Sequence, residues 1–146
     1  MKIYVLGSNR FLAEMLACKD KLCEIGMDGW IHPDYEAFGR GEKLDIWKRA
    51  HSGEHVQVKK ENNYVKEHYK NICDSDAILV VNSEKDGMKN YIGPNVLIEM
   101  GQAYVNDKKI FLLNEIPVGM PHTDEVETFD PICLHGELEN ITKYHK

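Results

Sequence analysis

Apolar and polar residues along the chain follow two patterns, one typical of buried strands and the other of helices with a single apolar face. Short apolar runs predict strands, and they occur in KIYVLG, DGWIH, AILVVN, KKIFLLN and ICLH. Apolar residues at intervals of three or four positions predict helices in SNRFLAEMLACKDKLCEIG, in NNYVKEHYKNICDSD and in the segment that begins at Pro94. This alternation predicts an α/β fold: a doubly wound, flavodoxin-like or Rossmann-like parallel sheet of about five strands with helices on both faces.

Two stretches depart from this alternation. From Pro33 to about Asn63 the chain is polar, contains three glycines and is expected to be irregular, with one short helix around EKLDIWKRA. We expect this stretch to be mobile or to form a lid. The tail from Pro117 contains loops punctuated by proline, and we expect it to add one short strand at ICLH and a short closing helix.

Length and composition narrow the class of protein. The chain has 146 residues, enough for one domain with a substantial core, so we treat residues 1–146 as a single domain. Apolar residues make up 42% and charged residues 29%, an ordinary balance for a globular protein. The net charge of -6 argues against a protein that binds a nucleic-acid polymer, but backbone N–H groups can still bind a small anion locally.

The cysteines and the hydropathy bear on location. The four cysteines form no CxxC pair, and the chain has neither a signal-peptide core nor an apolar run that could span a bilayer. We therefore expect a cytoplasmic protein with reduced thiols and no membrane partner.

The predicted topology indicates where a ligand would bind. Open parallel sheets bind ligands beyond the carboxyl ends of their strands. The loops of interest are Gly7–Arg10, Asn82–Gly93 and the chain from Asn114 onward.

The turn GSNR directly follows the first predicted strand. Gly7 would allow a ligand to approach the backbone, Ser8 can cap the next helix, and the helix N-terminus attracts anions. The turn matches neither GxGxxG nor a P-loop, so it predicts neither a dinucleotide fold nor an NTPase. A plain helix cap followed by a surface arginine, Arg10, explains the same residues.

The helix that begins at IGPN carries the strongest candidate for chemistry. With Gly93 at the N-cap and Pro94 in the first turn, Glu99 falls in the second turn, at the margin of the core-facing side. That side comprises Val96, Met100, Ala103 and Tyr104. A partly buried Glu99 could be catalytic, or it could be a rim glutamate paired with a lysine.

Two further features of the sequence concern a second subunit and a metal ion. Ile98 and Val105 lie on the opposite, apolar side of the same helix, which suggests a covering second subunit. His51 and His55 have the i, i+4 spacing of metal ligands, but no third ligand is evident, so we predict no metal site.

Three of these segments, in their order and approximate spacing, resemble one known family. IYVLGSNR, SDAILVVN and GPNVLIEMGQAYVNDKKIFLL are similar to the nucleoside 2-deoxyribosyltransferase family, including its deoxynucleoside 5'-monophosphate N-glycosidase branch. The similarity extends from Lys2 to about Leu113, and its most specific part is E-M-G-x-A after a turn of small residues. It implies the same doubly wound fold and an enzyme that cleaves the bond between a base and a 2-deoxyribose.

The resemblance also implies roles for individual residues. Glu99 stands at the position of the family nucleophile, which forms a glycosyl ester, and Tyr4 at that of the tyrosine that orients it. The remaining matches would hold the base, sugar or 5'-phosphate of a small nucleoside or nucleotide: Gly7, Ser8, Asn9, Arg10, Gly93 and Asn95. The resemblance implies no cofactor, and it implies a homo-oligomer whose sites are completed by a neighbouring subunit.

The chain departs from the family at two places. The serine that the phosphate branch places before the nucleophile is absent, and the aspartate that helps protonate the leaving base is replaced by Asn63 or His68, depending on the alignment. An asparagine cannot act as an acid, and a histidine can do so only when protonated. Asp86 is the other nearby acid and a further candidate for contact with the substrate.

The sequence therefore leaves several functions open. The first is hydrolysis or transfer at the N-glycosidic bond, with the base and the acceptor undetermined. The second is a nucleotide-binding sensor that has lost efficient chemistry, which the missing aspartate favours. The third is a hydrolase or binder of an NAD-derived nucleotide that uses the same glutamate.

Overall fold

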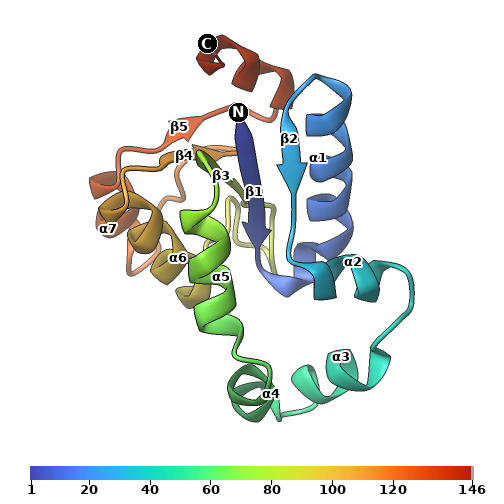
Figure 1. Ribbon diagram of the computed structural model, residues 1–146. Coiled ribbons are helices and arrows are strands. Elements are labelled where there is room, and N and C mark those ends of the chain that lie inside the picture. The colour runs from blue at the N-terminus through green and yellow to red at the C-terminus, as the bar shows by residue number, and fades with distance from the viewer. Residues whose placement is uncertain (146) are drawn as a thin grey trace.

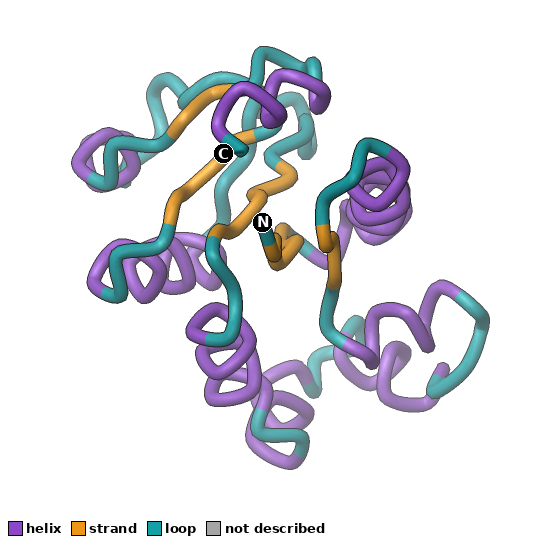
Figure 2. The backbone as a smooth tube through the Cα atoms, turned by 45° about the horizontal axis from the view of Figure 1, so that its top comes forward, coloured by secondary structure: helices purple, strands orange, loops and turns teal. Residues whose placement is uncertain are grey.

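The computed structural model describes residues 1–145, and its centre is a sheet of five parallel strands in the order β2-β1-β3-β4-β5. The strands are β1 (Lys2–Gly7), β2 (Asp28–Trp30), β3 (Ala77–Val81), β4 (Lys109–Leu112) and β5 (Ile132–Cys133). All five predicted strands are present, and every pair of neighbours is parallel. Helices cover both faces of the sheet, so the predicted doubly wound α/β fold is confirmed (Figures 1 and 2).

The alternation of side chains along the strands divides the core into two layers. In β1, Ile3 and Val5 face one cluster of buried residues, while Tyr4 and Leu6 face the other. The first layer lies against α1 (Leu12–Glu24) and the closing 3-10 helix η2 (Leu138–Tyr144); the second lies against α5 (Tyr64–Cys73), α6 (Pro94–Val105) and α7 (Thr123–Thr128). Each residue of β3 is buried, as expected for a central strand covered on both faces.

The stretch from Pro33 to Asn63 differs from the prediction. It was expected to be irregular with one short helix, but it forms three: α2 (Pro33–Gly39), α3 (Leu44–Ala50) and α4 (His55–Glu61). Each of these helices is only seven residues long, too short to show a clear helical period in the sequence. Figure 1 shows α3 and α4 beyond the end of β1, away from the two layers that cover the sheet.

The other elements contain smaller differences. The short helix α7 was predicted to be loop; it has six residues, and only Val126 among them is buried. In α6, Val96, Met100 and Ala103 are buried as predicted, but Tyr104 is 48% exposed because it lies at the edge of the core-facing side, against Phe129. Within residues 1–145, no helix is both long and apolar enough to cross a membrane.

Candidate functional site

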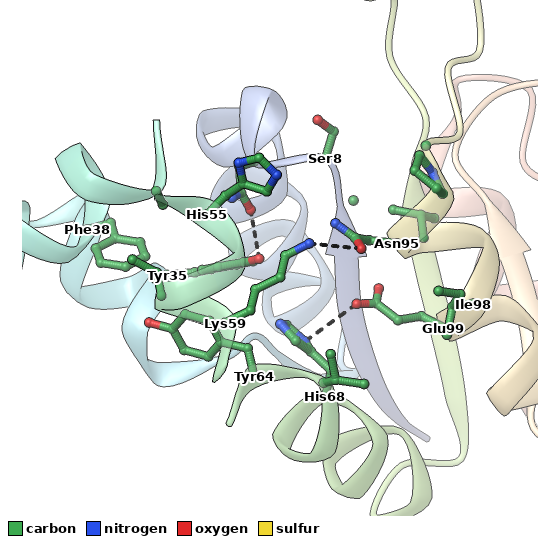
Figure 3. A pocket seen from close by; sticks show the side chains of 18 of the residues that line it. Ser8, Tyr35, Phe38, His55, Lys59, Tyr64, His68, Asn95, Ile98 and Glu99 are labelled. Atoms are coloured by element: carbon green, nitrogen blue, oxygen red, sulfur yellow. Dashed lines mark hydrogen bonds and ion pairs between the residues drawn. The ribbon is translucent and has the colours of Figure 1, made fainter. Parts of the chain in front are cut away.

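A cavity of about 380 Å³ lies beyond the carboxyl ends of β1 and β3, where the prediction placed a ligand. Its walls come from the turn after β1, from α2 to α4, from α5 and from the start of α6 (Figure 3). The predicted residues that line it are Gly7, Ser8, Asn9, Gly93, Asn95 and Glu99.

Glu99 projects into this cavity from the second turn of α6. The helix begins where the sequence predicted, with Gly93 in an extended conformation at the N-cap and Pro94 in the first turn. The Glu99 side chain is only 14% exposed. Burial raises the pKa of the Glu99 carboxyl to about 8, although the charge of Lys59 acts in the opposite direction. Without a ligand, most Glu99 side chains are therefore protonated at neutral pH.

His68, on the buried side of α5, is the closest basic group to Glu99. Its Nδ1 atom lies 4.0 Å from Glu99 Oε1. Burial lowers the pKa of His68 to about 3, with further contributions from the charges of His32 and Lys59. Since His68 is neutral near pH 7, this contact is not a salt bridge.

Tyr4 reaches the site through His68 and not directly. Its hydroxyl lies 2.6 Å from His68 Nδ1, and Asn71 Nδ2 donates to the same hydroxyl at 3.3 Å. Burial raises the pKa of Tyr4, so the phenol keeps its proton and needs an acceptor. His68 Nδ1 is that acceptor, which places the histidine proton on Nε2. The predicted contact between Tyr4 and Glu99 is thus replaced by a contact between Tyr4 and His68.

The structure places the two residues that the resemblance suggested for the general acid, Asn63 and His68, in different surroundings. Asn63 is exposed at the start of α5, with a φ of 55°, and does not line the cavity. His68 lines the cavity and contacts both Tyr4 and Glu99. Of the two residues, His68 is the one placed to act on a ligand.

Arg10 and Asp86, both predicted to contact the substrate, lie outside the cavity. They form an ion pair with each other, and their side chains are 56% and 66% exposed. Asp86 occupies a tight turn with a φ of 51°, followed by Gly87, and this turn directs its carboxylate toward Arg10 at the surface. Neither residue is among those that line the cavity.

Gly7 lines the cavity, but its lack of a side chain serves the packing of the sheet. A Cβ atom at this position would lie 2.9 Å from the carbonyl oxygen of Val81 and 3.2 Å from the sulfur of Met15. The predicted role, close approach of a ligand to the backbone, is therefore not needed to explain this glycine.

The residues that sequence reasoning missed come from the stretch expected to be irregular. Lys59 on α4 donates to Asn95 Oδ1 at 3.0 Å, and its charge lowers the pKa of both Glu99 and His68. Aromatic side chains from the same stretch line the cavity: Tyr35, Phe38 and Trp47. The wide spacing of the aromatic residues between polar ones was the only sequence signal for this wall.

The histidines considered as metal ligands belong to no cluster of ligands within residues 1–145. Across residues 1–145, no group of three His, Cys, Asp or Glu side chains could share a metal ion. His51 instead packs its ring against Trp47, with 4.1 Å between the ring centroids, and His55 lies in the cavity wall.

The chain was compared with protein families and with curated proteins. No protein-family model matches the chain, and no curated protein is significantly similar to it.

Proposed function

We propose that the protein cleaves or transfers at the N-glycosidic bond of a 2'-deoxynucleoside or its 5'-monophosphate, with Glu99 as the nucleophile. The observation that carries this proposal is the position of Glu99, a shielded carboxyl group in the wall of a cavity with aromatic side chains opposite. A carboxylate in such a place can attack a sugar carbon without competition from bulk water.

The reaction would proceed in two steps. The Glu99 carboxylate attacks C1' of the sugar, the C1'–N bond breaks, and its electron pair leaves with the base. Water then hydrolyses the glycosyl ester, or a second base accepts the sugar; either step returns the carboxylate, and the proton that the water or the second base gives up goes to the departed base. Before the first step Glu99 must lose its proton, and the nearby Lys59 ammonium favours the charged form.

The leaving base gains negative charge and needs a hydrogen-bond donor. A carboxylic acid would normally supply it, but Asp86 is directed to the surface. We assign this task to His68 Nε2–H and the Lys59 ammonium, two donors of residues that line the same cavity as Glu99. His68 would act as a neutral donor, since burial keeps its pKa near 3.

A second candidate is a nucleotide-binding sensor without efficient catalysis. The protonation states favour it, since a neutral Glu99 beside a neutral His68 makes a polar binding surface but a weak nucleophile. Under this alternative the same cavity would hold the nucleotide and leave it intact.

Chromatographic detection of free base separates the two candidates. The protein is incubated with deoxynucleosides, deoxynucleotides, ribonucleotides and NAD, alongside Glu99→Gln and the control Glu84→Gln, an exposed acid outside the cavity. We expect wild type and Glu84→Gln to release base from a deoxy substrate, and Glu99→Gln to lose at least about 10³-fold in rate. If wild type releases no base from any compound, the enzymatic proposal fails; release from NAD alone would point to an NAD-derived substrate.

We also propose that the protein works as a homo-oligomer. Exposed apolar side chains gather on α5 and α6, two helices in contact with each other beside the cavity: Val65, Tyr69, Ile98, Tyr104 and Val105. Ile98 also lines the cavity, so a second subunit on this face would border the ligand. A cytoplasmic location, expected from the cysteines, remains part of this proposal.

A further inference from the structure

Asn9 is held in one orientation by a tyrosine. Its Oδ1 atom accepts a hydrogen bond from the Tyr35 hydroxyl at 2.8 Å. The Tyr35 hydroxyl is part-buried and needs an acceptor. If the amide were turned over, two N–H groups would face the hydroxyl, and the hydroxyl proton would lose its partner. The orientation of the amide is therefore fixed by chemistry and not only by shape.

The other end of the amide is then a donor. Asn9 lines the cavity, and its Nδ2 atom has no hydrogen-bond partner within residues 1–145. This nitrogen is also not enclosed by protein, because it is absent from the buried polar atoms without a partner. Its two N–H groups are free to donate to a ligand in the cavity.

The surroundings of Asn9 suit a planar ring. Tyr35 and Phe38 come from α2 and Trp47 from α3; Phe38 lies 6.1 Å from Tyr35 and 5.2 Å from Trp47 between ring centroids. Figure 3 shows Tyr35 and Phe38 on one side of the cavity and Glu99 with Ile98 on the other. A nucleoside with its sugar at Glu99 would therefore place its base toward Tyr35 and Asn9.

We propose that Asn9, oriented by Tyr35, selects bases that present a hydrogen-bond acceptor, so that the site prefers oxo bases to the matching amino bases. This inference rests on the proposed function, because it assumes that a nucleoside occupies the cavity. It names the substrate class within that function: 6-oxopurine or 4-oxopyrimidine deoxynucleosides and their 5'-monophosphates. An amino group at the same position would set donor against donor and leave both without a partner.

Binding measurements on two matched pairs of ligands test this inference. Deoxyinosine is compared with deoxyadenosine, and deoxyuridine with deoxycytidine, by calorimetry on Glu99→Gln protein, which prevents turnover. We expect the oxo member of at least one pair to bind about tenfold or more tightly than its amino partner. Equal binding of both members in both pairs, tighter binding of the amino members, or no binding of any of the four compounds would overturn the inference.

Two further variants, made in the same Glu99→Gln background, ask whether Asn9 is the cause. Asn9→Asp keeps the shape of the side chain. One carboxylate oxygen can still accept a hydrogen bond from Tyr35, while the other replaces the Nδ2 donor with an acceptor. We expect this change to reverse the preference in favour of the amino bases. Tyr35→Phe frees the amide to rotate, and the ratio of affinities should fall toward one. An oxo preference that survives Asn9→Asp would show that another residue reads the base.

The two proposals fail in different ways. A protein that binds oxo bases selectively but releases no base would refute the proposed catalysis and support the role of Asn9. A protein that releases oxo and amino bases equally well and binds them equally would support the catalysis and refute the role of Asn9.

Discussion

The buried position of Glu99 disfavours the charged form of its carboxyl group, which is the form that a nucleophile needs. It holds the only carboxyl group in the cavity wall that residues 1–145 form. Burial destabilises the Glu99 carboxylate and therefore raises the pKa of this group to about 8. A ligand that needs the carboxylate must therefore supply the free energy that ionises Glu99, and by favouring the charged form it lowers the Glu99 pKa when it binds.

The raised pKa predicts how stability depends on pH. The folded protein keeps the Glu99 proton up to about pH 8, whereas the unfolded chain loses it near the ordinary glutamate pKa of 4.5. Between these values the folded state binds more protons, so the free energy of unfolding falls as pH rises. Glu99→Gln removes this loss. Its stabilising effect should therefore be greater at about pH 8 than at about pH 5, by on the order of 3 kcal/mol.

Urea unfolding of wild type and Glu99→Gln at the two pH values provides the measurement. Glu84→Gln, the exposed acid, should show almost no such difference and serves as the control. A stability difference between Glu99→Gln and wild type that is the same at both pH values would mean that Glu99 is ionised in the folded protein at neutral pH.

The sequence could predict the position of Glu99 but not that of its partners. Gly93 and Pro94 mark the start of α6, and counting along the helix then places Glu99 at the margin of the core. Lys59 comes from α4 and donates to Asn95, 36 positions later in the chain, and no local pattern in the sequence indicates that contact. The sequence could not show that Arg10 and Asp86 lie outside the cavity, because a loop residue near the site can point either way and their ion pair forms at the surface.

At the scale of elements, α2, α3 and α4 form the cavity wall that the sequence did not reveal. These helices leave the sheet after β2 and return at α5 (Figure 1). Their polar residues face solvent and a few apolar ones, such as Phe38 and Val58, line the cavity. Short polar helices of this kind depend on tertiary contacts, so propensity and periodicity alone predict a loop. The central strands β1, β3 and β4, by contrast, are mostly buried on both faces and carry a strong local signal.

The packing of α1 against β2 gives a prediction at this scale. A Cβ atom at Gly29 would lie 2.7 Å from the Cβ of Leu22 and 2.9 Å from the carbonyl oxygen of Lys19, both in α1. Gly29→Ala should force the helix and the strand apart and reduce the free energy of unfolding by about 1–3 kcal/mol. Urea or thermal unfolding measures the change.

Gly101 in α6 provides the matched control. A Cβ atom there would lie 3.6 Å from the Phe129 ring, an ordinary contact, and alanine suits a helix interior better than glycine. Gly101→Ala should leave stability unchanged or raise it by up to about 1 kcal/mol. A Gly29→Ala protein as stable as Gly101→Ala would show that α1 and β2 are not packed as closely as described.

At the scale of the whole molecule, the two-layer core explains why the fold could be predicted and the site only in part. Alternate side chains of each strand pack into the two layers of the core, and this pattern can be found within a single contiguous segment of the sequence. The cavity depends on where distant segments meet: the turn after β1, the three short helices, α5 and α6. The rule that ligands bind at the carboxyl ends of parallel strands located the cavity, but it could not name the far wall.

The proposed oligomer concerns the surface of the whole molecule. Val105 is 75% exposed at the end of α6, next in sequence to the exposed Tyr104. Val118 is 93% exposed, but it lies in the loop between β4 and α7, so it provides a matched control. If α5 and α6 form the contact between subunits, a charge at Val105 would be buried without a partner, whereas a charge at Val118 would remain in water.

Sedimentation of the wild-type protein should therefore give at least twice the mass of one chain, and Val105→Asp should give the mass of a single chain. Val118→Asp should sediment like wild type, and circular dichroism should show that both variants remain folded. A wild-type protein that sediments as one chain at all concentrations would refute the oligomer. An oligomer that survives Val105→Asp would place the contact between subunits on another face. Ile98, which lines the cavity, would then face solvent, and residues of one chain would complete the site.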